Sequence, residues 1–140
     1  MQPLVDLHRQ PSVSPVEASG YAADEVRAMQ RTVGNIFAQW GVTDGEAAVI
    51  LGGISAKTFR RWREGAYGRV NRDLADRLSL VLGIHRALRV IFREPATGYA
   101  WMRQPTADLG GLTPVELLLR GGMGDLERLR RYLDSVQGGW

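Results

Sequence analysis

Residues 43–65 read Thr-Asp-Gly-Glu-Ala-Ala-Val-Ile-Leu-Gly-Gly-Ile-Ser-Ala-Lys-Thr-Phe-Arg-Arg-Trp-Arg-Glu-Gly, and this stretch decides the fold. Thr43 and Glu46 have the spacing of a capping box, which predicts that a helix begins at Asp44. The glycine pair at 52–53 allows the positive φ with which a helix ends in a sharp turn. The sequence therefore predicts a short helix followed by a tight turn.

A second helix is expected directly after the turn. Ser55 is a suitable N-cap, and Phe59 and Trp62 lie three residues apart, so they share one face of the helix. Two short helices joined by a glycine-containing turn are typical of a helix-turn-helix. The alternative is a plain helical hairpin inside an α-helical domain.

The distribution of charge favours DNA binding over the plain hairpin. Residues 55–77 contain seven lysines and arginines against three acidic residues, a net +4, whereas the whole chain carries +3. A solvated helix face also carries charges, but here the cations coincide with the helix-turn-helix pattern, where a phosphate backbone would need them. With Phe59 and Trp62 in the core, the candidate DNA-binding residues are Ser55, Lys57, Thr58, Arg60 and Arg61.

Composition limits the class of protein. The chain has 140 residues, of which 44% are hydrophobic and 24% charged, as expected for one soluble globular domain or two small ones. It has no cysteine, which excludes disulfides and thiolate metal sites. We expect a cytoplasmic protein, because neither a signal-peptide pattern nor a membrane-spanning apolar run is present.

The rest of the chain predicts further helices and no β-strand, so we expect an all-α fold. Prolines and missing periodicity predict a poorly ordered tail over residues 1–20. Gly83 is expected to weaken or kink a helix that is capped by Asn71. Apolar spacing and capping signals place the helices at 22–40, 71–82 with a continuation over 84–92, 96–102, 113–120 and 125–136, with a loop at 105–111.

No residues form a recognisable catalytic constellation. The chain lacks a phosphate-binding loop, a nucleophile elbow and paired metal ligands. His8 lies in the predicted tail and His85 in an apolar helix, where a histidine is more often packed than a ligand. Glu46 and Glu116 are explained as capping residues. We therefore expect neither an enzyme, nor a metal site, nor a cofactor.

Several separated motifs in the second half of the chain resemble one known family. They are the run Arg77-Leu-Ser-Leu-Val-Leu-Gly-Ile-His-Arg-Ala-Leu-Arg-Val-Ile-Phe92, then Tyr99-Ala-Trp101, Gly110-Gly-Leu-Thr-Pro-Val-Glu-Leu-Leu118, and Gly122-Met-Gly-Asp-Leu-Glu-Arg-Leu-Arg-Arg-Tyr-Leu-Asp134 before a Gly-Gly-Trp end. In this order they resemble the Xre/MbcA/ParS antitoxins, over roughly residues 40–140. One departure is Gly-Leu-Thr-Pro, where relatives often carry Gly-Arg-Ser.

The resemblance implies an antitoxin of a type II toxin-antitoxin module. Such a protein is expected to bind and inhibit a co-encoded RES-domain toxin that consumes NAD or transfers ADP-ribose from it, and to repress its own operon. It also implies a helix-turn-helix bundle, residues 21–82, packed with a small helical toxin-binding domain, residues 83–140. One helix-turn-helix binds a DNA half-site only weakly, and such proteins usually bind two half-sites as a two-fold symmetric dimer. We therefore expect a homodimer.

The end of the last helix and of the chain is the expected toxin contact. Gly138 and Gly139 form a slim lead to Trp140, whose flat side chain suits a pocket shaped for nicotinamide. The alternative is a frayed end in which Trp140 folds back onto its own helix. The candidate toxin-binding residues are Arg130, Arg131, Asp134, Gln137, Gly138, Gly139 and Trp140.

A second class of function stays open. A stand-alone helix-turn-helix transcriptional regulator would use its C-terminal part only to dimerise or to bind an effector. A neighbouring gene for a RES-type toxin would favour the antitoxin.

Overall fold

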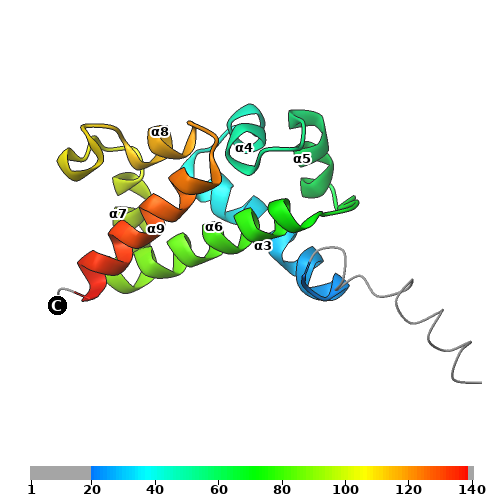
Figure 1. The fold of residues 1–140 in the computed structure, drawn as a ribbon, viewed down its shortest axis with the longest axis horizontal. Helices are drawn as coiled ribbons and strands as arrows, with labels where there is room; N and C mark the ends of the chain where they lie inside the picture. Colours follow the sequence, from blue (N-terminus) through cyan, green and yellow to red (C-terminus); the bar gives the residue numbers. More distant parts are fainter. Residues whose placement is uncertain (1–19, 139–140) are drawn as a thin grey trace, which may run out of the picture.

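A computed structural model of the chain describes residues 20–138, which fold into seven α-helices without any β-strand (Figure 1). The predicted all-α fold is thus confirmed. The predicted N-terminal tail lies outside these residues except for Gly20, and so do Gly139 and Trp140. The elements are α3 (Ala23–Trp40), α4 (Asp44–Leu51), α5 (Ala56–Arg63), α6 (Arg72–Ile91), α7 (Pro95–Trp101), the 3-10 turn η1 (Ala107–Leu109), α8 (Pro114–Leu118) and α9 (Met123–Gly138).

An aromatic row holds the first three helices together. The ring of Phe37 on α3 lies 5.8 Å from that of Trp40 and 5.9 Å from that of Phe59, which in turn lies 5.9 Å from Trp62. Phe59 and Trp62 are only 1% and 2% exposed, as their spacing predicted. Burial of such large rings is worth several kcal/mol in total and orients α5 against α3.

Helix α6 is the longest element and belongs to both parts of the molecule. The Asn71 side chain caps it by accepting a hydrogen bond from the Leu74 N–H at 2.9 Å. It continues through Gly83, where the sequence suggested weakening or a kink. A Cβ at Gly83 would lie 1.6 Å from Arg130 Nη1, so the glycine makes room for a side chain of α9. Helix α9 runs beside α6 in the same direction (Figure 1).

Of the remaining helices, α7 packs against α6 and α3, and α8 packs against α9. The predicted capping box at Thr113 and Glu116 is present, with hydrogen bonds of 2.8 and 3.0 Å, and begins α8. The expected loop at 105–111 contains the short 3-10 turn η1, in which Leu109 is buried. Helix α9 begins at Met123, earlier than expected, and reaches Gly138. From residue 20 to residue 138, no helix combines the length and apolar character needed to cross a membrane.

Candidate DNA-binding and partner-binding surfaces

Helices α4 and α5 form the predicted helix-turn-helix geometry. Thr43 Oγ1 accepts from the Glu46 N–H at 3.1 Å, while Glu46 Oε1 accepts from the Thr43 N–H at 3.0 Å. The chain leaves α4 through Gly52 and Gly53, with φ of 59° and 69°. Both glycines therefore have a positive φ, which other residues rarely adopt.

Ser55 and Thr58 set the N-terminus of α5. Ser55 Oγ accepts from the Thr58 N–H at 3.0 Å and lies 3.1 Å from Thr58 Oγ1, to which it donates. Both residues were predicted to bind DNA, and their side chains are engaged with each other in the free protein. The Thr58 hydroxyl can still donate a hydrogen bond, and the backbone N–H groups of the first turn lie at the same end of α5, which favours an anion.

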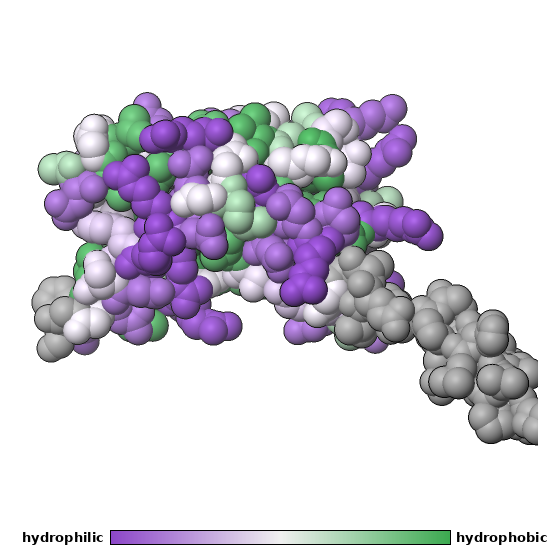
Figure 2. Space-filling model, in the orientation of Figure 1, coloured by the Kyte–Doolittle hydropathy of each residue, from purple (hydrophilic) through white to green (hydrophobic). Residues whose placement is uncertain are grey.

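Three cations predicted to bind DNA lie on the exposed face of α5. Lys57, Arg60 and Arg61 are exposed, and none of them forms an ion pair with a carboxylate of residues 20–138. Figure 2 shows hydrophilic side chains projecting outward beyond this helix, at the upper right. Exposed cations without partners are available to neutralise phosphates.

Two other arginines of the basic segment have structural roles. Arg63 pairs with Asp44 at 2.7 Å and links the end of α5 to the first turn of α4. Arg77 has a side chain only 12% exposed, and its guanidinium Nη1 donates to the carbonyl of Ile50 at 3.1 Å and to that of Gly121 at 2.8 Å. The charge available to DNA is therefore smaller than the count over residues 55–77 suggested.

Arg103 makes a second link between the two parts of the molecule. Its Nε donates to the carbonyl of Trp40 at 3.1 Å, and its Nη2 donates to the carbonyl of Gly41 and to Glu46 Oε1. The hydrogen bond from the Thr43 N–H lowers the pKa of Glu46, and Arg103 lowers it further, while burial acts in the opposite direction. From the sequence, Arg77 counts only toward the charge of residues 55–77, and Arg103 has no predicted role.

An aromatic cluster covers the C-terminal part. The rings of Trp101 and Tyr132 stack 6.2 Å apart at an interplanar angle of 7°, and the Tyr132 hydroxyl donates to Asp108 at 3.1 Å. Burial raises the pKa of Tyr132, and Asp108 raises it further. His85 stacks on Tyr99 at 5.9 Å, and burial lowers its pKa, with a smaller effect from Arg89. His85 is thus a packed residue, and residues 20–138 contain no cluster of three potential metal ligands.

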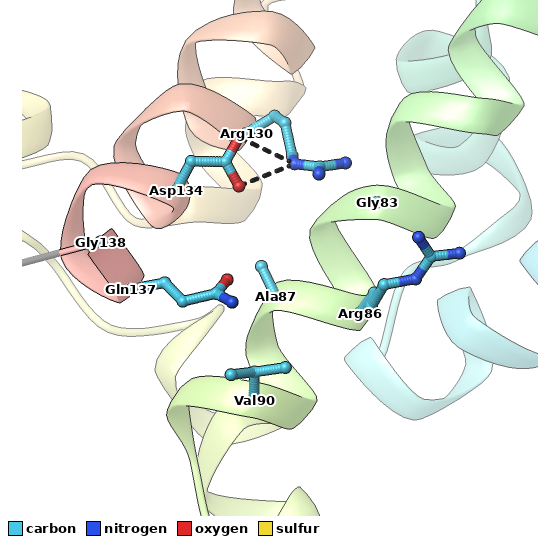
Figure 3. A pocket seen from close by; sticks show the side chains of 8 residues that line it. All are labelled: Gly83, Arg86, Ala87, Val90, Arg130, Asp134, Gln137 and Gly138. Carbon is cyan, nitrogen blue, oxygen red and sulfur yellow. Dashed lines mark hydrogen bonds and ion pairs between the residues drawn. The ribbon is translucent and has the colours of Figure 1, made fainter. Parts of the chain in front are cut away.

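Some of the predicted toxin-binding residues lie together in a groove at the end of α9, and others do not. Arg130 Nε donates to both carboxylate oxygens of Asp134, at 3.0 and 3.2 Å. Both residues line a groove between α6 and α9, together with Gln137 and Gly138 (Figure 3). Arg131 is exposed and lies outside the lining of this groove. Gly139 and Trp140 fall outside the described residues, so the predicted plug stays a prediction.

Comparison with known proteins divides the chain in two. Residues 20–83 match the family described as the antitoxin Xre-like helix-turn-helix domain. Residues 87–139 match the antitoxin Xre/MbcA/ParS C-terminal toxin-binding domain. The chain is also similar to a protein of Sinorhizobium fredii (strain NBRC 101917 / NGR234) named uncharacterized protein y4oB. The two are 31% identical over 127 residues, which cover 89% of this chain and 98% of that protein.

Proposed function

The chain belongs to the Xre/MbcA/ParS family of antitoxins, and on that premise we propose that it neutralises a co-encoded RES-domain toxin and represses its own operon. The observation that carries the proposal is the separation of two surfaces on one molecule. The cationic face of α5 lies at one end, and the end of α9 lies at the other (Figure 1).

DNA binding is assigned to α5. Its exposed Lys57, Arg60 and Arg61 would contact phosphates and base edges in a major groove, while Ser55 and Thr58 bring the helix N-terminus to the backbone. A homodimer would place two such helices about 34–36 Å apart, one turn of B-DNA. Because the target is the operon's own DNA, the protein would act in the cytoplasm.

Toxin inhibition is assigned to the C-terminal part. Arg130, Asp134 and Gln137 lie where α9 ends, and Arg131 is exposed beside them. The chain continues from Gly138 into Gly139 and Trp140, which we propose to enter the toxin's NAD-binding cleft. An aromatic ring is a plausible substitute for nicotinamide because both are flat and bury their faces in the same kind of slot.

The chemistry of the module would belong to the toxin. The antitoxin needs only to occupy a site and exclude the nucleotide, which requires shape and charge and no catalytic group of its own. A non-enzymatic inhibitor is in keeping with the roles of Glu46 and Glu116, whose carboxylates both cap helices.

Co-purification with the product of the neighbouring gene tests the proposal directly. We expect a stable complex in which NAD consumption by the toxin is suppressed in proportion to the antitoxin added. A complex that leaves NAD turnover unchanged, or no complex at all, would favour the stand-alone regulator. In that case the C-terminal part would dimerise or bind an effector.

A further inference from the structure

A groove of about 400 Å³ lies between α6 and α9 at the end of the molecule far from α5 (Figures 1 and 3). On α6, Gly83, Ala87 and Val90 provide an apolar wall. Within residues 20–138, two large apolar side chains are exposed. Val90 is 60% exposed, and Val49 is 45% exposed. Val90 is therefore the exposed apolar side chain of this wall, and a partner seated in the groove would cover it.

The rim of the groove is cationic. Arg86 lines it from α6; it is exposed and pairs with no carboxylate within the part of the chain that the structure describes. Arg130 lines the groove from α9 (Figure 3). The groove's one acidic lining residue, Asp134, is neutralised by Arg130 Nε, so the uncompensated charge at the rim is positive.

The position of Arg130 depends on Gly83. Its Nη1 occupies the space that a Cβ on residue 83 would need, and Asp134 holds its Nε from the other side. The guanidinium is therefore fixed over α6 rather than extended into solvent. Arg130 therefore gives the groove a fixed wall, while the charge left free to pair with a partner is that of Arg86.

We propose that this groove is a docking site for an acidic segment on the surface of the toxin, so that the toxin is held by the groove as well as by the chain end. A carboxylate of that segment pairs with Arg86, and an apolar side chain covers Val90. This inference rests on the proposed function, because it identifies where and by what chemistry the same partner is bound.

The combination of features favours a protein over DNA as the occupant. A phosphate backbone would use Arg86 but offers no apolar side chain to cover Val90. Gly138 also lines the groove, and it directly precedes the two residues that we propose to contact the toxin active site. One partner can therefore occupy the groove and receive the chain end together.

The test compares the affinity of the full chain for the neighbouring gene's RES-domain toxin in three variants. Arg86→Glu reverses the rim charge, Val90→Asp removes the apolar contact, and Arg31→Glu is a matched control on α3. All three residues are exposed, so thermal unfolding should confirm that each variant folds like the wild type. We expect Kd to rise at least about tenfold for the two groove variants, and the salt dependence of binding to flatten in Arg86→Glu, with little change in the control.

Each other outcome overturns the inference in a recognisable way. If the wild type binds the toxin and both groove variants bind equally well, the groove is not the docking site, while the proposed function stands. If Arg31→Glu weakens binding as much as Arg86→Glu, overall charge rather than the groove is responsible. If Arg86→Glu weakens only operator binding, the occupant is DNA. If the wild type does not bind the toxin, the proposed function fails, and this inference fails with it.

Discussion

Arg77 and Gly121 are joined across the molecule by a hydrogen bond of 2.8 Å from the guanidinium Nη1 to the backbone carbonyl. The same nitrogen donates to the carbonyl of Ile50 near the end of α4, at 3.1 Å. One side chain on α6 therefore satisfies carbonyls of the helix-turn-helix and of the turn before α9. The position of α4 relative to α9 depends on this contact.

Replacement of Arg77 by methionine should destabilise the protein by about 2–4 kcal/mol, because two carbonyls lose a charged donor and Asp73 loses its partner. Chemical denaturation followed by circular dichroism measures this. Arg72→Met is the matched control on the same helix, since Arg72 is 74% exposed and lies 4.0 Å from Asp76. We expect the control to change stability by less than about 0.5 kcal/mol. Equal effects from the two variants would refute the structural role of Arg77.

Alanine at both Arg60 and Arg61 should weaken operator binding and reduce its dependence on salt. Each arginine that contacts a phosphate releases counterions, so the slope of log K against log salt should fall by about 2 in magnitude when two contacts are lost. Electrophoretic or fluorescence titrations over a series of salt concentrations measure the slope. Arg128→Ala, an exposed position on α9, should leave it unchanged. An unchanged slope in the double variant would remove α5 from the DNA interface.

Truncation of residues 138–140 should impair toxin inhibition while leaving the fold intact. Gly138 is the exposed last residue of α9, so its loss removes no core contact. The readout is NAD consumption by the toxin as antitoxin is added, with thermal unfolding as the check on folding. Inhibition equal to that of the full chain would mean that Trp140 does not occupy the toxin's active site.

Glu46 should make the stability of the fold sensitive to acid. Its pKa is lowered in the folded state, mainly by the hydrogen bond from the Thr43 N–H and then by Arg103. A lowered folded-state pKa means that the stabilisation is complete above the ordinary glutamate pKa of about 4.3 and is lost as the pH falls through the lower folded-state value.

Glu46→Gln is the variant that isolates this effect, because the amide oxygen still accepts from Thr43 but carries no charge. Below about pH 4.3 the wild type should lose stability more steeply than the variant. Urea unfolding at a series of acidic pH values provides the comparison. Parallel curves for the two proteins would show that Glu46 does not contribute to the acid sensitivity.

Local signals were enough to predict most of the fold. The capping boxes at Thr43 and Thr113 and the N-caps at Ser55 and Asn71 all appear in the structure, because a cap depends on residues only three positions apart. Periodicity likewise identified the buried faces of α3, α5 and α9. These features need no knowledge of how the helices pack.

Contacts between distant segments were not predictable in the same way. Arg77 and Arg103 bind backbone carbonyls. Every residue has a backbone carbonyl, so the sequence does not indicate which one an arginine will bind. Gln30, which is fully buried and donates to the carbonyl of Tyr67 at 2.7 Å, belongs to the same class. The sequence alone therefore counted Arg63 and Arg77 toward a DNA-binding charge that the structure uses for internal contacts.

The role of Gly83 could not be predicted from the sequence either. A glycine within a helical pattern usually weakens the helix, but its neighbour in space decides whether the missing side chain is useful. Here that neighbour is Arg130, which lies 47 residues further along the chain. Its guanidinium fills the space above Gly83 only when α9 is packed on α6.

The uninterrupted course of α6 restricts how this kind of protein is put together from parts. A division at residue 82, where the two predicted domains meet, would cut a helix of 20 residues near its middle and leave each fragment with an uncovered apolar stripe. Exchange of toxin-binding parts between related antitoxins would therefore have to splice two half-helices in phase, since one residue too many or too few rotates everything downstream by about 100°. Among related antitoxins, insertions should consequently be much rarer within α6 than in the turns on either side of it.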